Sequence, residues 1–140
     1  MLWGCMKWGG VVYVTKIEGK MENELQQTLE FWGKTTDDVV FQQDNDPKHT
    51  SKKAKKWFED NNVLKWPALS PDLTPIEHLW HHLKKKLGEY EEPANSVTEL
   101  WERVQEEWDK IPKEEYQKLI ESMPKRLAAV VRTKGGYTKY

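Results

Sequence analysis

The order of the expected elements predicts an α/β fold with a mixed sheet. Strand-like segments come early in the chain and alternate with helical ones, whereas only helical patterns follow residue 75. Turn residues separate these segments, and 140 residues are enough for one domain with a genuine core. The expected order is strand, strand, helix, strand, helix, strand, and then a series of helices.

The N-terminal segment is expected to form a hairpin followed by a helix. Residues 2–8 and 11–17 are typical of strands, and the glycine pair between them is typical of a hairpin turn. Residues 21–32 place apolar side chains at helical spacing, and Gly33 is expected to end this helix. The apolar stripe consists of Met21, Leu25, Leu29 and Trp32.

Three further elements are expected before residue 70. The apolar run at 38–43 is typical of a short strand that ends at Asp44. A helix over about 51–61 and a short strand over 63–67 are expected to follow. Pro67 ends this strand, and Pro71 and Pro75 lie in the connector after it, which is therefore expected to be rich in turns.

Helices are expected throughout the second half of the chain. One begins at Pro75, and its apolar residues recur at helical spacing as far as Leu87. A second begins after Ser96, because Ser96 and Glu99 have the spacing of a capping box.

Two prolines divide the remaining C-terminal segment. Pro112 is expected to open a further helix, and Pro124 is expected to break or kink it, because proline cannot continue the hydrogen bonding of a helix. The residues that follow this last helical segment, 135–140, are expected to form a loose basic tail.

Charged residues are sorted into blocks, although the formal net charge is only −1. Residues 44–88 hold nine lysines against six acids, together with all four histidines. Residues 89–122 hold eleven acids against four bases, and residues 123–140 hold five bases and no acid. Such blocks can create local fields that the net charge hides, but a run of charge is more often a solvated face.

Several classes of protein are disfavoured by the composition. Cys5 is the only cysteine, which excludes an internal disulfide and a paired-cysteine zinc site and favours a reducing compartment. No apolar run is long enough to span a membrane, and the start has no signal-peptide pattern. We therefore expect an intracellular protein without a membrane partner.

Asp44 and Glu77 each have an ordinary structural explanation. Asp44 begins the sequence Asp-Asn-Asp-Pro, which is typical of a turn. Thr74, Pro75 and Glu77 have the pattern of a capping box with proline at the first helical position. Taken separately, each acid is best explained as a local structural residue.

Taken together, Asp44 and Glu77 also fit a metal site. Hard divalent cations need oxygen ligands, and Mg²⁺ is usually bound through one or two carboxylates plus water and phosphate oxygens. An aspartate at the end of a strand and a glutamate in the first turn of a helix can converge at a sheet edge. The lysines that follow Asp44 suit a phosphate backbone, so this pair would suit two-metal phosphoryl transfer.

Other candidate ligands are less favoured. Asp46 lies beyond the expected strand end, and Asp72 is most simply a turn residue. His78, His81 and His82 lack both a cysteine cluster and a recognised zinc spacing. A basic helix face beside DNA is the favoured interpretation of these histidines.

Two segments, QQDNDPKHTSK at 42–52 and WPALSPDLTPIEHLW at 66–80, resemble the catalytic domain of mariner-superfamily transposases. Shorter matches, LWGCM, IEGKM, PKRL and KGGYTKY, extend the resemblance nearly from end to end. The resemblance implies a ribonuclease-H-like mixed sheet flanked by helices, and a DDE triad of carboxylates that binds Mg²⁺ or Mn²⁺. Asp44 falls on the second Asp of that triad and Glu77 on its Glu.

The resemblance also implies an activity and partners. The parent activity is metal-dependent DNA cleavage and strand transfer in transposition, with Asp44 and Glu77 as catalytic and metal-binding residues. The expected partner is DNA, both the transposon ends and the target. A full-length transposase or a second copy of this chain is a further expected partner. No small-molecule substrate is implied. The expected DNA-binding residues are Lys48, His49, Lys52, Lys53, Lys55 and Lys56.

Three features depart from the family pattern. The first catalytic Asp of the family precedes the hairpin with which this sequence begins, so we expect the chain to lack the central first strand and to be inactive as it stands. Asp44 and Glu77 enclose 32 residues, two fewer than is usual. Thr74 replaces the usual Asn, a mild change because both residues cap helices well.

The predicted organisation is one partial catalytic domain. Its ribonuclease-H-like core is expected at 1–88, a C-terminal helical extension at 89–134 and a basic tail at 135–140. The alternative function is a non-catalytic remnant that binds nucleic acid or a transposase.

Overall fold

The structure, a computed structural model, describes residues 2–9, 13–17, 22–42, 56 and 70–140. The chain divides into two compact units. The first comprises residues 1–3 and 17–70, and the second comprises residues 4–16 and 71–140. Strands and helices are both present, which confirms the predicted α/β class.

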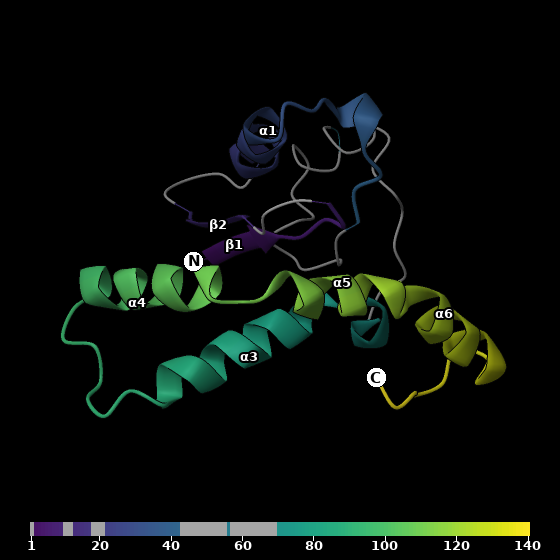
Figure 1. The fold of residues 1–140 in the computed structure, drawn as a ribbon. Coiled ribbons are helices and arrows are strands. Elements are labelled where there is room, and N and C mark those ends of the chain that lie inside the picture. Colours follow the sequence, from purple (N-terminus) through teal and green to yellow (C-terminus); the bar gives the residue numbers. More distant parts are fainter. Residues whose placement is uncertain (1, 10–12, 18–21, 43–55, 57–69) are drawn as a thin grey trace. The chain divides into compact units, whose positions relative to one another are not determined.

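The N-terminal strands pair with each other. Strands β1 (Leu2–Cys5) and β2 (Tyr13–Lys16) form a two-stranded sheet, and both are shorter than the predicted ranges (Figure 1). The predicted helix at 51–61 and strand at 63–67 lie outside the described residues, except for Lys56, which is helical and exposed.

Helix α1 (Glu22–Phe31) ends where the sequence predicts it to end. Gly33 has φ +61°, a left-handed conformation that glycine adopts without steric cost. The amide of Gly33 donates to the carbonyl of Glu30, and the amide of Lys34 donates to the carbonyl of Leu29. These two hydrogen bonds are those of a Schellman motif, which satisfies carbonyls at the helix end.

The strand predicted at 38–43 is not formed by the described residues 38–42. Asp38 instead ends a 3₁₀ turn, η1 (Thr36–Asp38), and residues 39–42 have no regular secondary structure. The Asp38 carboxylate accepts hydrogen bonds from the Thr35 amide at 2.8 Å and the Thr35 hydroxyl at 3.0 Å. This local capping favours a helical turn, so the prediction of a strand from the apolar run was wrong.

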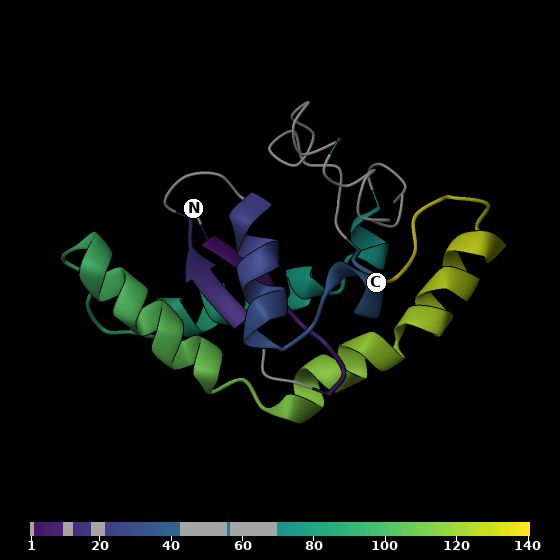
Figure 2. The same cartoon turned by 90° about the horizontal axis from the view of Figure 1, so that it is seen from above.

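The second unit contains the C-terminal helices that the sequence predicts. They are η3 (Pro71–Leu73), α3 (Ile76–Gly88), α4 (Val97–Asp109), α5 (Lys113–Glu121) and α6 (Met123–Arg132). Figure 1 shows α3 and α4 side by side, and Figure 2 shows α4, α5 and α6 one after another along the chain. Pro112 and Pro124 lie at the starts of α5 and α6, as predicted.

Helix α4 begins with the side-chain cap that the sequence predicts. The Ser96 hydroxyl accepts a hydrogen bond from the Glu99 amide at 3.0 Å. The Glu99 carboxylate accepts a hydrogen bond from the Asn95 amide at 2.8 Å. In a standard capping box, this carboxylate would instead accept from the amide of Ser96, the next residue. The loop before α4 is held by Tyr90, whose hydroxyl donates to Glu107 at 3.1 Å.

The core of this unit is formed mainly by α3, α4 and α5. Its buried members are Leu79, Leu83, Val104, Trp108, Ile111 and Tyr116. Trp80 stacks on Trp108 with ring centroids 4.8 Å apart and planes tilted by 32°. No helix among the described residues has the length and apolar character needed to cross a membrane.

Replacing Gly4 with alanine should lower the free energy of unfolding by about 1–3 kcal/mol, the usual cost of overpacking. A Cβ atom at Gly4 would lie 2.7 Å from the Trp80 ring and 3.2 Å from the Trp108 ring, and each ring is held by the other. The measurement is urea denaturation followed by circular dichroism. Gly9→Ala is the matched control, because a Cβ at Gly9 meets nothing within 4 Å. Equal losses in the two variants would contradict this packing.

The acidic block at 89–122 is partly neutralised by lysine and arginine side chains of the same helices. Lys110 contacts Glu106 at 2.7 Å and Glu107 at 2.8 Å, and these two hydrogen-bonded carboxylates raise the pKa of Lys110. Arg103 pairs with Glu99 one helical turn away. These neighbours favour the interpretation of this block as a solvated face rather than a site.

Candidate active site

The structure describes only part of the predicted site. Glu77 lies in the first turn of α3 and is exposed, and Lys56 is exposed. The other predicted site residues lie outside the described residues: Asp44, Lys48, His49, Lys52, Lys53 and Lys55. Asp46, which the sequence disfavours as a ligand, lies in the same range.

The backbone that carries Glu77 is anchored by buried neighbours. Leu73 is 4% exposed, and Thr74 and Pro75 are also buried. The Glu77 amide donates to the Thr74 carbonyl at 3.1 Å, and the His78 amide donates to the Pro75 carbonyl at 3.1 Å. A fixed backbone with an exposed side chain is a suitable geometry for a ligand on a rigid element.

The capping box predicted for Thr74 and Glu77 is not formed. Helix α3 is capped by Pro75 without a side-chain hydrogen bond, and the Glu77 amide is satisfied by the backbone oxygen of Thr74. Among the described residues, Glu77 makes no hydrogen bond or ion pair through its carboxylate. The ordinary explanation of Glu77 as a cap is therefore wrong, and the cap does not use its carboxylate oxygens.

Asp72 is a structural residue, as the sequence predicts. It lies in η3, and its carboxylate accepts hydrogen bonds from the Thr138 amide at 3.0 Å and the Thr138 hydroxyl at 2.7 Å. Its backbone carbonyl accepts a hydrogen bond from Arg126 at 2.9 Å. The tail predicted to be loose is thus tied to η3 through Thr138, because Asp72 accepts both of its donors.

His78 faces Arg126 rather than a cluster of other ligands. Its Nε2 atom lies 3.0 Å from Arg126 Nη2. Arginine has donors only, so His78 Nε2 accepts the hydrogen bond and the ring proton lies on Nδ1. Burial first, and then the Arg126 charge, lower the pKa of His78. Within the described part of the chain, no three His, Cys, Asp or Glu residues gather as a metal site.

Arg126 is a residue of this region that the sequence did not identify. It is 2% exposed, and its guanidinium spans Asp72 and His78, the residues on either side of the Glu77 turn. An arginine within an apolar helical pattern is a weak signal, because such side chains often lie at the edge of a helix face. Only its burial and its partners distinguish it.

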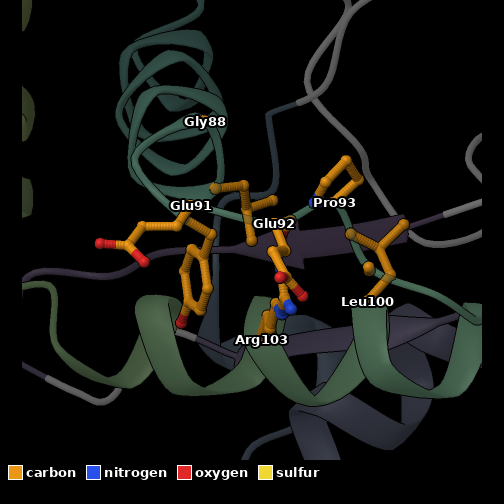
Figure 3. A pocket seen from close by; sticks show the side chains of 9 residues that line it. Gly88, Glu91, Glu92, Pro93, Leu100 and Arg103 are labelled. Carbon is orange, nitrogen blue, oxygen red and sulfur yellow. The ribbon is translucent and has the colours of Figure 1, made fainter.

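A pocket of about 330 Å³ lies at the opposite end of α3, where the chain turns into α4 (Figure 3). Arg103 lies over the Tyr90 ring, 4.4 Å from its centroid, and donates to the Glu92 carbonyl at 2.6 Å. Leu87 and Leu100 add apolar surface. Glu91 and Glu92 also line this pocket. The guanidinium of Arg103 already contacts Tyr90 and the Glu92 carbonyl, so it is not free to bind a phosphate there.

Comparisons with known proteins agree with the predicted family. A family model described as a DDE superfamily endonuclease matches residues 10–101. The Tcb2 transposable-element transposase of Caenorhabditis briggsae is 38% identical over 149 residues, which cover 100% of this chain and 54% of that protein. The Tc1 transposase of Caenorhabditis elegans is 39% identical over the same length and coverage. The chain thus spans about half the length of these relatives.

Solved structures show the same fold. The Mos1 transposase catalytic domain, solved with Raltegravir and Mg, has a TM-score of 0.74 and 23% identity over 99% of this chain and 76% of that one. The same domain with Raltegravir and Mn has a TM-score of 0.73 and 24% identity. This similarity confirms the predicted ribonuclease-H-like fold. The family-model match spans positions 44 and 77, and the chain belongs to the DDE superfamily of endonucleases.

Proposed function

We propose that this chain is a fragment of a transposase catalytic domain, whose parent activity is the cleavage of DNA and the transfer of its strands with Mg²⁺ or Mn²⁺. The observation that carries the proposal is the exposed Glu77 carboxylate on a buried, fixed turn, within a chain that belongs to the DDE superfamily. The curated relatives are transposases, which supports DNA as the substrate. Association with a full-length transposase or a second copy stays a prediction.

Asp44 and Glu77 are the residues that would hold the metal. Carboxylate oxygens are the ligands that hard divalent cations prefer. Glu77 fits this role because it is exposed and, among its described neighbours, unpaired. Its place at the N-terminal end of a helix also favours a negative charge on the side chain. The Mos1 catalytic domain was solved with Mg and with Mn, which supports the choice of these two ions.

The chain's own residues would bind and align the DNA. Lysine and histidine side chains near Asp44 would contact phosphates of the backbone, which hold the DNA without reading its sequence. A cation held by Glu77 and Asp44 would offset the electrostatic repulsion between their carboxylates and the reacting phosphodiester. When bound, such a cation activates the attacking oxygen and stabilises the leaving one.

The substitution Glu77→Gln should weaken Mn²⁺ binding by more than about 100-fold, because loss of a ligand should exceed the 10–100-fold effect typical of outer-shell substitutions. Electron paramagnetic resonance of unbound Mn²⁺ measures the affinity directly. Asp44→Asn should have a similar effect.

Glu102→Gln is the matched control, because Glu102 is also an exposed helical glutamate. Its Mn²⁺ affinity should equal that of the wild type. If Glu77→Gln and Glu102→Gln both bind Mn²⁺ as the wild type does, the proposed metal site is wrong. If both weaken binding equally, the ion is held by general negative charge and the proposal is also wrong.

A further inference from the structure

Arg126 is a buried charge whose three hydrogen-bond partners are uncharged groups. Its side chain comes from α6 and is 2% exposed. Nε donates to the Ser122 hydroxyl at 2.7 Å, and Nη1 donates to the Asp72 carbonyl at 2.9 Å. Nη2 donates to His78 Nε2 at 3.0 Å. A charge removed from water is tolerated only when it is hydrogen-bonded in this way.

Without its partners, burial of the Arg126 guanidinium would be energetically unfavourable. Burial lowers its pKa, which reports that the charged form is disfavoured there. A cation near the N-terminal end of α3 is also disfavoured by the helix dipole. A cation–π contact partly offsets this unfavourable energy, because the centroid of the Tyr140 ring lies 4.7 Å from the guanidinium carbon.

The guanidinium joins two points that flank the turn carrying Glu77. Asp72 lies five residues before Glu77, and His78 lies immediately after it. A planar guanidinium presents its donors in a fixed geometry, so the two hydrogen bonds fix the η3 carbonyl and the first turn of α3 relative to each other.

The end of the chain closes this arrangement. The C-terminal residues turn back from α6 toward η3 (Figures 1 and 2), where Thr138 donates twice to the Asp72 carboxylate. The Tyr140 amide then donates to the Thr138 hydroxyl at 3.3 Å, and its ring covers Arg126. Asp72 is therefore held by its carbonyl and its carboxylate at once, from α6 and from the tail.

We propose that Arg126 is a positioning residue for Glu77, and that the last three residues of the chain complete its support. The inference rests on the proposed role of Glu77 as a metal ligand. Mg²⁺ demands near-ideal geometry from its ligands, so a turn that shifts or frays would lose affinity while its carboxylate remained present. The C-terminal tail would then be part of the site's construction.

The test measures four properties of the full chain carrying Arg126→Gln, Arg126→Lys or Tyr140→Ala. Mn²⁺ affinity reports ligand placement, and a thermal melt reports folding. Amide hydrogen exchange at Glu77 and His78, without metal, reports whether the turn is held. ¹⁵N NMR of the His78 ring reports the hydrogen bond to Nε2. Tyr137→Ala is the control for Tyr140→Ala, since Tyr137 belongs to the same tail but is 100% exposed.

Arg126→Gln should weaken Mn²⁺ binding by about tenfold, the lower end of the range for outer-shell substitutions, and should speed exchange at Glu77 and His78. Arg126→Lys should restore neither the Mn²⁺ affinity nor the slow exchange, because lysine keeps the charge but lacks the planar guanidinium with its fixed donors. Tyr140→Ala should weaken binding by about twofold or more, because it removes the cation–π contact that covers the buried guanidinium. Tyr137→Ala should change nothing.

The outcomes separate this inference from the proposed function. If Glu77→Gln weakens Mn²⁺ binding but folded Arg126→Gln does not, the positioning role is wrong and the proposed function stands. If Glu77→Gln does not change Mn²⁺ affinity, the proposed function is wrong. The positioning role is then wrong as well, even if slow amide exchange shows that Arg126 holds the turn. If the Arg126 variants do not fold, equal Mn²⁺ affinity and exchange in Tyr140→Ala and Tyr137→Ala would overturn the inference.

Discussion

Replacing Trp108 with alanine should lower the free energy of unfolding by about 3–5 kcal/mol, the usual cost of removing a buried aromatic side chain. Trp108 is 2% exposed and lies in the core formed by α3, α4 and α5. The substitution leaves a cavity and also removes the ring stack with Trp80, which is worth about 0.5–1.5 kcal/mol beyond the area buried. Since small domains have about 5–15 kcal/mol in total, this is a large share.

The measurement is urea denaturation followed at 222 nm by circular dichroism, which avoids the tryptophan signal that the substitution itself changes. Trp8→Ala is the control, because Trp8 is 49% exposed and offers the same side chain without the same burial. Its loss should be below about 1 kcal/mol, as for most surface substitutions. A loss below about 1 kcal/mol for Trp108→Ala as well would show that this core does not stabilise the unit.

Local sequence chemistry predicted the ends of elements well. Gly33 ends α1 because its left-handed backbone and two short-range hydrogen bonds depend only on neighbouring residues. Ser96 caps α4 for the same reason. The wrong strand at 38–43 also has a local cause: the apolar run was weighed alone, and the Thr35–Asp38 hydrogen bonds, which fix a helical turn, were not.

Contacts between distant residues were not predictable in the same way. Arg126 and Asp72 are 54 positions apart, and Thr138 and Asp72 are 66 positions apart. No pattern of spacing or composition joins such residues, because their meeting depends on how α6 and the tail pack on η3. The sequence therefore predicted a loose basic tail, and it gave no signal that distinguished Arg126 from the other charged residues.

The candidate site combines a residue that local sequence predicted with long-range contacts that it did not predict. Glu77 was identified because its motif is contiguous in the sequence, and the structure adds that its carboxylate is not used by the predicted cap. The contacts that hold its turn come from the end of the chain, so sequence patterns could identify the proposed ligand but not the residues that support it. A residue that breaks a local rule, here a predicted cap that is not formed, is the kind of deviation expected at a functional site.

Reversing the charge of Lys52, Lys53, Lys55 and Lys56 to glutamate should abolish binding to duplex DNA at low salt. These four lysines are expected to contact phosphates, and Lys56 is exposed. Four contacts predict a slope of about −3.6 in log affinity against log salt, hence a loss of roughly 100-fold between about 50 and 200 mM salt for the wild type. Because phosphates carry no sequence information, unrelated duplexes should bind equally well. Fluorescence anisotropy of labelled duplexes over a salt series measures both properties.

The control for this prediction must change the net charge by the same amount. Lys113, Lys118, Lys125 and Lys134 are exposed in the second unit, so their joint replacement by glutamate matches the first set in number and in charge. If DNA is held by the predicted lysines, the control variant should keep most of the wild-type affinity and nearly the same salt slope, apart from a weaker long-range attraction that salt screens. Equal losses in both variants would mean that DNA responds only to net charge. Wild-type affinity in the first variant would show that the lysines after Asp44 do not contact DNA at all.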